Sequence, residues 1–280
     1  MTGPDSPRDL LIVGAGGFAR ETAQAVAAVN AVRPTWRLLG FLDDDPALTG
    51  KQIDGVGILG GSDLVHKHPQ AHVVVCVGSP RGLYSRALVV HRLGLPAERY
   101  ATVVHPTAVI SRDSVVGPGT VLLAHTVLTA AVTVGSHIAV MPQAVLTHDC
   151  VLEDYVTIAS GVRLGGTCRL ERGVYLGAGA VIREMVTIGS WSLVGMGSVV
   201  LRDVPASEAW VGNPATLLRV IPVPDPVAAE LARPPAQTPA GSGTQTFTQP
   251  AGADLTPTGR PAPRDAGAGR PAAAERSELR

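Results

Sequence analysis

The chain has 280 residues, and its 23 basic side chains balance 23 acidic ones, so the formal net charge is zero. Nucleic-acid binding normally needs a basic surplus, and a membrane span needs about twenty consecutive apolar residues; the sequence offers neither. Three cysteines are too few for a disulfide framework and form no CxxC zinc pattern. We therefore expect a cytoplasmic protein that binds neither nucleic acid nor a membrane.

The segment 9–100 alternates apolar runs with helix-like stretches. Strands are expected at 10–13, 36–42 and 72–77, and helices at 20–29 and 84–93. Nearly continuous aliphatic runs separated by helices are typical of a parallel sheet in an α/β domain. The first strand leads into a glycine-rich turn over 14–19, which fits the G-x-G-x-x-A pattern that places phosphate at a helix N-terminus.

From Val104 an aliphatic residue recurs at every sixth position, for seventeen consecutive positions up to Val200. The residue four positions after each of them is small or β-branched. This period predicts a prism with three flat faces per coil, in which the aliphatic residue points inward and the small one fills the corner. Cys150 and Cys168 are three hexads apart at the small position, so we expect stacked, reduced core residues.

These patterns predict an α/β plus all-β fold class. We expect a small Rossmann-like domain over 9–100, a left-handed parallel β-helix over 101–221 and a disordered tail over 222–280. The tail is rich in Pro, Ala, Gly and Thr and holds almost no large apolar residues. Such a segment cannot bury enough apolar surface to offset its ordering entropy. A dehydrogenase is disfavoured, because the glycine-rich turn is followed by a β-helix and not by a second domain for hydride transfer.

Several segments occur in a characteristic order around the hexads, and together they resemble one family. They are the glycine-rich turn, Phe41–Asp45, His105–Ala108, Thr147–Cys150 and Val211–Ala215. Over residues 9–221 the chain resembles the bacterial hexapeptide-repeat sugar acyltransferases of the sialic-acid O-acetyltransferase and UDP-4-amino-sugar N-acetyltransferase type. The resemblance implies acetyl-CoA or another acyl-CoA as co-substrate, a sugar or nucleotide sugar as acceptor, no metal, and a homotrimer that buries the flat sides of a short β-helix.

His148 is the candidate general base. It lies at an outward-facing corner of its hexad and is followed by Asp149, whose carboxylate would favour the imidazolium form. Acyl transfer from a thioester needs a base on the acceptor, and imidazole suits this role near neutral pH. A surface His beside an Asp is more often a solvated corner, so it is the resemblance that places the catalytic pair on His148 and Asp149. It implies direct transfer without a covalent enzyme intermediate.

The resemblance also implies binding residues for both substrates. For acyl-CoA these are Thr157, Gly166, Gly195 and Met196; for the acceptor they are Gly16, Gly17, Phe18, Asp43, Asp44 and Gly78. Each glycine is equally well explained by a corner of the fold, and the aspartates by a polar strand end. Thr157 stands where related enzymes have a second histidine. Met141 and Pro142 replace an Asn-Thr pair of related enzymes, which points to a different acceptor.

Two alternatives remain open in the sequence. His105, His125 and His137 suggest zinc, although they lack the H-x4-H spacing that zinc enzymes on this helix use. We interpret His105 as the start of the first coil and the other two as solvated corners. The second alternative is a non-catalytic β-helix that only binds a nucleotide or a protein partner. Nothing in the sequence distinguishes N-acylation from O-acylation.

Overall fold

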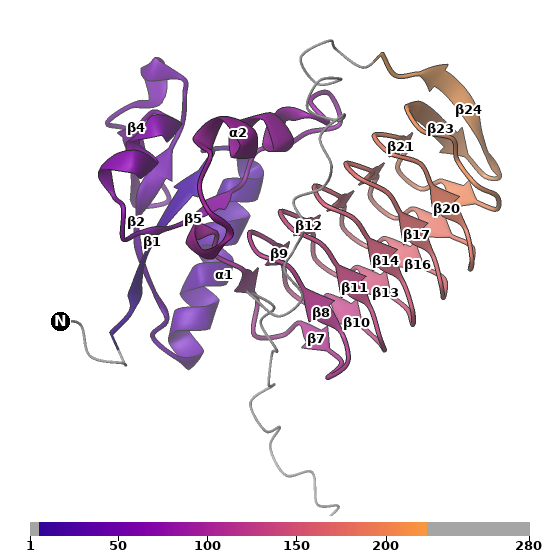
Figure 1. Ribbon diagram of the computed structural model, residues 1–280, viewed down its shortest axis with the longest axis horizontal. Helices are drawn as coiled ribbons and strands as arrows, with labels where there is room; N and C mark the ends of the chain where they lie inside the picture. Colours follow the sequence, from indigo (N-terminus) through magenta and orange to yellow (C-terminus); the bar gives the residue numbers. More distant parts are fainter. Residues whose placement is uncertain (1–5, 223–280) are drawn as a thin grey trace, which may run out of the picture. The chain divides into compact units, whose positions relative to one another are not determined.

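The computed structural model describes residues 6–222, and it begins with an α/β part (Figure 1). Its sheet has the order β3-β4-β2-β1-β5. The parallel strands are β1 (Arg8–Val13), β2 (Trp36–Leu42), β4 (Val56–Gly60) and β5 (His72–Val75), and β3 (Gln52–Ile53) pairs antiparallel with β4. The strand order reverses between β1 and β5, so their carboxyl ends form the crevice where open α/β sheets bind ligands.

Two α-helices cover opposite sides of this sheet. Alternate residues of β1 pack with α1 (Gly17–Val32) on one side, and with Leu93 of α2 (Ser85–Leu93) on the other. Short 3-10 helices occupy Pro46–Leu48, Ser62–Lys67 and Ala97–Arg99. The predicted strands 10–13 and 36–42 and both helices are present. The expected strand 72–77 is shorter, because the chain leaves the sheet after Cys76 N–H donates to the Val13 carbonyl.

The rest of the described chain is a parallel β-helix built from seventeen two-residue strands and a closing hairpin. The strands are β6 (Val103–Val104), β7 (Val109–Ile110), β8 (Val115–Val116), β9 (Val121–Leu122), β10 (Val127–Leu128), β11 (Thr133–Val134), β12 (Ala139–Val140), β13 (Val145–Leu146), β14 (Val151–Leu152), β15 (Thr157–Ile158), β16 (Arg163–Leu164), β17 (Arg169–Leu170), β18 (Tyr175–Leu176), β19 (Val181–Ile182), β20 (Thr187–Ile188), β21 (Leu193–Val194) and β22 (Val199–Val200). The hairpin is β23 (Glu208–Gly212) and β24 (Ala215–Val220).

These strands form three sheets, which we call the first, second and third faces. The first face runs from β6 through β9, β12, β15, β18 and β21 to the hairpin; the second holds β7, β10, β13, β16, β19 and β22; the third holds β8, β11, β14, β17 and β20. From β6 to β19 each strand pairs in parallel with the strand eighteen residues further on, as Val127 does with Val145, and β21 pairs with β23 of the hairpin. Figure 1 shows the coils stacked in this way.

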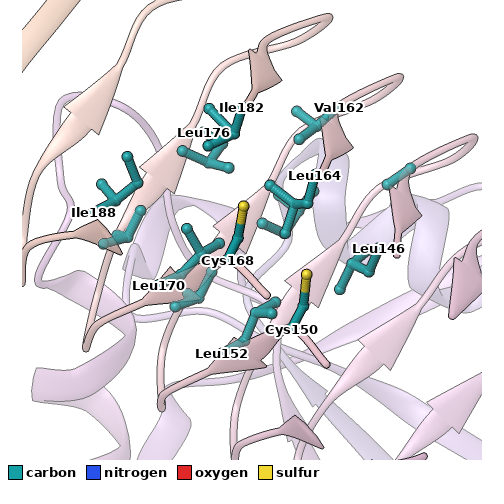
Figure 2. Packing of buried hydrophobic residues seen from close by; sticks show 14 of the residues in the cluster. Leu146, Cys150, Leu152, Val162, Leu164, Cys168, Leu170, Leu176, Ile182 and Ile188 are labelled. Carbon is teal, nitrogen blue, oxygen red and sulfur yellow. The ribbon is translucent and has the colours of Figure 1, made fainter. Parts of the chain in front are cut away.

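The hexad prediction is confirmed position by position. The second residue of every strand from β6 to β22 is one of the predicted aliphatic residues, and all of them are buried except the half-buried Val104. Figure 2 shows Leu146, Leu164 and Ile182 stacked in one row, beside Cys150 and Cys168. Both cysteines are free thiols in the core. Burying one such Leu or Ile side chain stabilises the fold by roughly 1.5–3 kcal/mol.

The α/β part packs on the first face of the β-helix. Val103, Val121 and Leu123 of that face share one buried cluster with residues of α1 such as Ala25 and Val26. The fold class is therefore as predicted, an α/β part followed by a parallel β-helix. None of the helices within residues 6–222 is long and apolar enough to cross a membrane. The disorder predicted for the tail concerns residues that, apart from Pro222, lie outside the described part of the chain.

Candidate functional site

His148 lies at a corner that leads from the second face to the third. β13 ends at Leu146 and β14 begins at Val151, and Asp149 makes the turn with a φ of 60°. The corner is fixed to both neighbouring coils, because Asp149 N–H donates to the Ala130 carbonyl (3.0 Å) and the His148 carbonyl accepts from Thr167 N–H (2.8 Å). The backbone is thus held while both side chains stay exposed.

The imidazole of His148 has a defined orientation. Its Nδ1 lies 2.8 Å from Oδ2 of Asp149. A carboxylate only accepts hydrogen bonds, so Nδ1 carries the proton and Nε2 presents its lone pair. This is the tautomer that a general base requires, and the Asp149 carboxylate holds the ring in that orientation.

Gly166 lies one coil further along the same corner and provides the space for this ring. A Cβ built on Gly166 would lie 2.4 Å from both Cε1 and Nε2 of His148. Any larger residue would displace the imidazole, so the side chain missing at Gly166 is what lets His148 occupy its position. This contact lies within the chain itself and gives Gly166 a structural reason that is independent of any ligand.

The other predicted acyl-CoA residues lie elsewhere on the β-helix. Gly195 and Met196 follow β21 at the corner between the first and second faces, and Thr157 belongs to β15 on the first face. Met196 is among the most exposed apolar residues described, at 82%. Within a single chain, Gly166 is therefore the only one of the predicted acyl-CoA residues that lies beside His148 and Asp149.

The glycine-rich turn lies at the N-terminus of α1. Gly16 is the residue before the helix, and no side chain of the described residues caps the helix there. A Cβ at Gly16 or Gly17 would meet no described atom within 4 Å, so packing within residues 6–222 does not demand glycine at either position. Small residues leave the first N–H groups of α1 accessible, and such groups favour an anion.

The two predicted acidic residues are held by other groups of the α/β part. Asp43 Oδ2 accepts from Ala15 N–H at 3.0 Å, so this carboxylate supports the glycine-rich turn. Asp44 accepts from Ser62 N–H and from Arg92. Partial burial raises the pKa of Asp44, but the hydrogen bonds from Arg92 and Ser62 outweigh it and hold the pKa at about 2.

Arg86 of α2 is a residue that the sequence reasoning missed. It is 4% exposed, and its Nη1 donates to the His137 carbonyl at 3.0 Å, while its Nη2 donates to the Thr157 hydroxyl. Arg86 lies seven residues before the buried Leu93, hence on the same helix face, and that spacing was the available signal. Gly78, Arg86 and Thr157 line part of a narrow gap at this place that is too tight to hold a water molecule.

His137 differs from its prediction as a solvated corner. It is buried, its ring stacks on Tyr155 at 5.4 Å, and its edge meets Tyr100 at 4.4 Å. The expectation was wrong because the α/β part covers this corner of the β-helix. His125 is exposed, as expected. Within residues 6–222 no group of three or more His, Cys, Asp or Glu side chains is arranged to hold a metal ion.

Similarity to known proteins extends over both parts of the chain. Residues 9–91 match the family described as the PglD N-terminal domain. GDP-perosamine N-acetyltransferase from Escherichia coli O157:H7 is 28% identical over 221 residues, which are 75% of this chain and 96% of that protein. Among solved structures, the acetyltransferase domain of PglB from Neisseria gonorrhoeae, in complex with acetyl coenzyme A, has a TM-score of 0.66 and 28% identity, covering 76% of this chain and 100% of its own.

WeeI from Acinetobacter baumannii is similar to the same extent, with a TM-score of 0.64 and 30% identity over 75% of this chain and 99% of that one. Matches of this length include the α/β part as well as the coils, so the likeness is to the whole two-part protein and not to the hexapeptide repeat alone. The chain therefore belongs to the NeuD- and PglD-like family of sugar acetyltransferases, and it is an acyltransferase.

Proposed function

We propose that the chain transfers an acetyl group from acetyl-CoA to the amino group of a nucleotide-linked sugar, with His148 as the general base. The observation that carries this proposal is the His148 imidazole, held by Asp149 with its Nε2 free to accept a proton. The acetyl coenzyme A bound by PglB supports the donor. The GDP-perosamine N-acetyltransferase similarity supports a nucleotide-sugar acceptor and N-transfer. We also propose a cytoplasmic location for the chain.

In this mechanism the acceptor nitrogen attacks the thioester carbonyl while Nε2 of His148 takes its proton. The C–N bond forms, the C–S bond breaks, and the imidazolium returns the proton to the leaving CoA sulfur. Asp149 stabilises the imidazolium between these steps. General base catalysis of this kind contributes about 10²- to 10⁴-fold. Because the acyl group passes directly from sulfur to nitrogen, no group on the chain becomes acylated.

We also propose that the site forms between subunits of a homotrimer. The outward side of the second face is mostly valine, with Val109 at 47% and Val181 at 38% exposure. His148 lies at one corner of this face, and Gly195 and Met196 lie at the other. If copies pack through this face, the two kinds of corner lie side by side at the subunit interface. Acyl-CoA would then contact Gly166 and Thr157 as well as Gly195 and Met196, although these residues do not lie together within a single chain. The acceptor would lie near Gly16, Gly17, Phe18, Asp43, Asp44 and Gly78.

The test is release of CoA from acetyl-CoA in the presence of UDP-, GDP- and CMP-linked amino and hydroxy sugars, with wild type beside His148→Ala. We expect turnover with an amino sugar, reduced about 10²- to 10⁴-fold by the substitution. Because His148 is exposed, the thermal midpoint of the His148→Ala protein should stay within about 2 °C of the wild-type value. Equal turnover by both proteins would remove His148 from the mechanism, and turnover only with hydroxy sugars would change the reaction to O-transfer.

A further inference from the structure

Arg86 is a buried cation without a negative partner. No carboxylate within residues 6–222 forms an ion pair with it, and its Nε finds no hydrogen-bond partner there. The ionisable groups that act on it are the Cys76 thiol and the Tyr155 hydroxyl, both of which are neutral near pH 7. Burial lowers the pKa of Arg86 to about 10, which leaves the guanidinium charged under physiological conditions.

The position of the guanidinium matters as much as its charge. Its carbon lies 5.8 Å from the ring centroid of Phe18, in the first turn of α1, and a Cβ on Gly78 would lie 3.3 Å from Nη2. Phe18 follows β1 and Gly78 follows β5, the two strands between which the sheet order reverses. Arg86 therefore lies at the crevice where an open α/β sheet binds its ligand.

A purely structural role does not account for this residue. Its two known acceptors, the His137 carbonyl and the Thr157 hydroxyl, are both neutral. A neutral donor would satisfy them without burying a charge, and a buried charge is costly unless it is paired. The nearby N-terminus of α1 has no acidic residue in its first turn and also favours an anion. Among residues 6–222 no carboxylate pairs with the guanidinium, and the carboxylate of Asp43 is bonded to Ala15 N–H in the turn before the helix rather than to the first turn itself.

We propose that Arg86 binds the diphosphate of the nucleotide-sugar acceptor, which bridges the guanidinium and the N-terminus of α1. The identity of the acceptor rests on the proposed function, whereas the anion-binding role rests on Arg86 itself. Arg86 also holds the Thr157 hydroxyl, so it connects the diphosphate to the first face of the β-helix. A bidentate guanidinium suits phosphate oxygens better than an ammonium does.

The experiment uses calorimetry to measure how tightly the full-length chain binds inorganic pyrophosphate, GDP and UDP. Guanosine and uridine, which lack the diphosphate, are measured for comparison. The variants are Arg86→Gln, which keeps a neutral donor, Arg86→Lys, which keeps the charge, and Arg37→Gln as a control that removes an exposed cation paired with Asp9. We expect Arg86→Gln to weaken pyrophosphate binding about 10- to 100-fold. Arg86→Lys should recover part of this loss, and the control should match wild type.

The nucleosides and acetyl-CoA separate charge recognition from a general defect. Arg86→Gln should bind both nucleosides and acetyl-CoA within about twofold of wild type, since the nucleosides carry no phosphate and the glutamine amide can still donate to the Thr157 hydroxyl that we assign to acyl-CoA. The proposal is overturned if wild type binds neither pyrophosphate nor either nucleoside diphosphate, if Arg86→Gln binds pyrophosphate like wild type, or if acetyl-CoA is the ligand that it loses. Arg86-dependent pyrophosphate binding by a protein that acetylates no nucleotide sugar would support the proposal and contradict the proposed function.

Discussion

Two neighbours hold the imidazole of His148 in place. Asp149 fixes its tautomer through the 2.8 Å contact to Nδ1, and Gly166 leaves the space that the ring occupies. The first interaction acts through charge and the second through the absence of a side chain. If His148 is the general base, as proposed, its attachment to the neighbouring coils gives it the rigidity of the β-helix, which favours a precise approach to the substrate.

Substitution of Gly166 by Ala tests this support. The added methyl group would lie 2.4 Å from two ring atoms, so the imidazole must rotate outward. We expect kcat to fall about 100-fold, because displacing a catalytic group by about 1 Å has effects of that size. Stability should change little, since the displaced ring is exposed. Gly57→Ala is the matched control, because a Cβ there meets no described atom within 4 Å.

The buried His137 makes stability depend on pH. Burial, and then the charge of Arg86, lowers its pKa from 6.5 to about 3, so between these values the unfolded chain binds a proton that the folded chain does not. The free energy of unfolding should therefore decrease as pH falls through this window, by up to about 1.4 kcal/mol per pH unit. Urea unfolding at pH 7 and pH 5 measures the slope. His137→Gln should reduce it, and His125→Gln, at an exposed corner, should not.

The residues of the candidate site differ in how far the sequence predicts them. The hexad register predicts that His148 and Asp149 face outward at a corner, but their choice as the candidate pair depends on the resemblance to the sugar acyltransferases. The burial of Arg86 and His137 depends on the packing of the α/β part against the β-helix, a contact between segments far apart in the chain. The helical spacing from Leu93 indicates only that Arg86 shares a buried face of α2, not which segment covers that face, and nothing in the hexad pattern distinguishes His137 from a solvated corner.

The two residues of each β-helix strand have opposite roles. In β17 Leu170 is fully buried, whereas Arg169 is exposed and paired with Glu153. Leu170→Ala should lower the free energy of unfolding by about 2–5 kcal/mol, through lost transfer energy and a cavity that the stacked coils cannot close. Arg169→Ala should cost at most about 1 kcal/mol. Equal losses in chemical denaturation would contradict the assignment of inward and outward positions.

At the scale of elements, the short strands of the β-helix were easier to predict than the longer sheet. Seventeen repeats of the same pattern support one prediction, and a strand is present at each of the predicted aliphatic positions. The pair β3 and β4 was not predicted, because β3 has two residues and β4 contains Gly57 and Gly60, so neither shows an alternating apolar pattern. These strands lie at the edge of the sheet, where β4 pairs with β2 and β3 pairs with β4.

The first face of the β-helix carries the α/β part, and the second face, whose outward side is mostly valine, is the one that we propose for assembly. Val181 and Val115 have nearly equal exposure, 38% and 37%, but lie on the second and third faces respectively. Val181→Asp should convert a trimer of the 28.8 kDa chain into monomers and abolish turnover, since a charge in an apolar interface is unfavourable. Val115→Asp should retain the trimer in light scattering. A monomeric wild type would refute the inter-subunit site.

The eighteen-residue register also limits how the length of this chain can vary. Each strand pairs with the strand eighteen positions away, as Leu128 does with Leu146, so one residue inserted within a strand would turn every later aliphatic side chain outward. Variation in length is restricted to loops that bulge from a corner, or to whole coils added or removed. A homologue that gained a coil beyond His148 would have a longer β-helix, an unchanged corner at His148, and a larger distance from that corner to the closing hairpin.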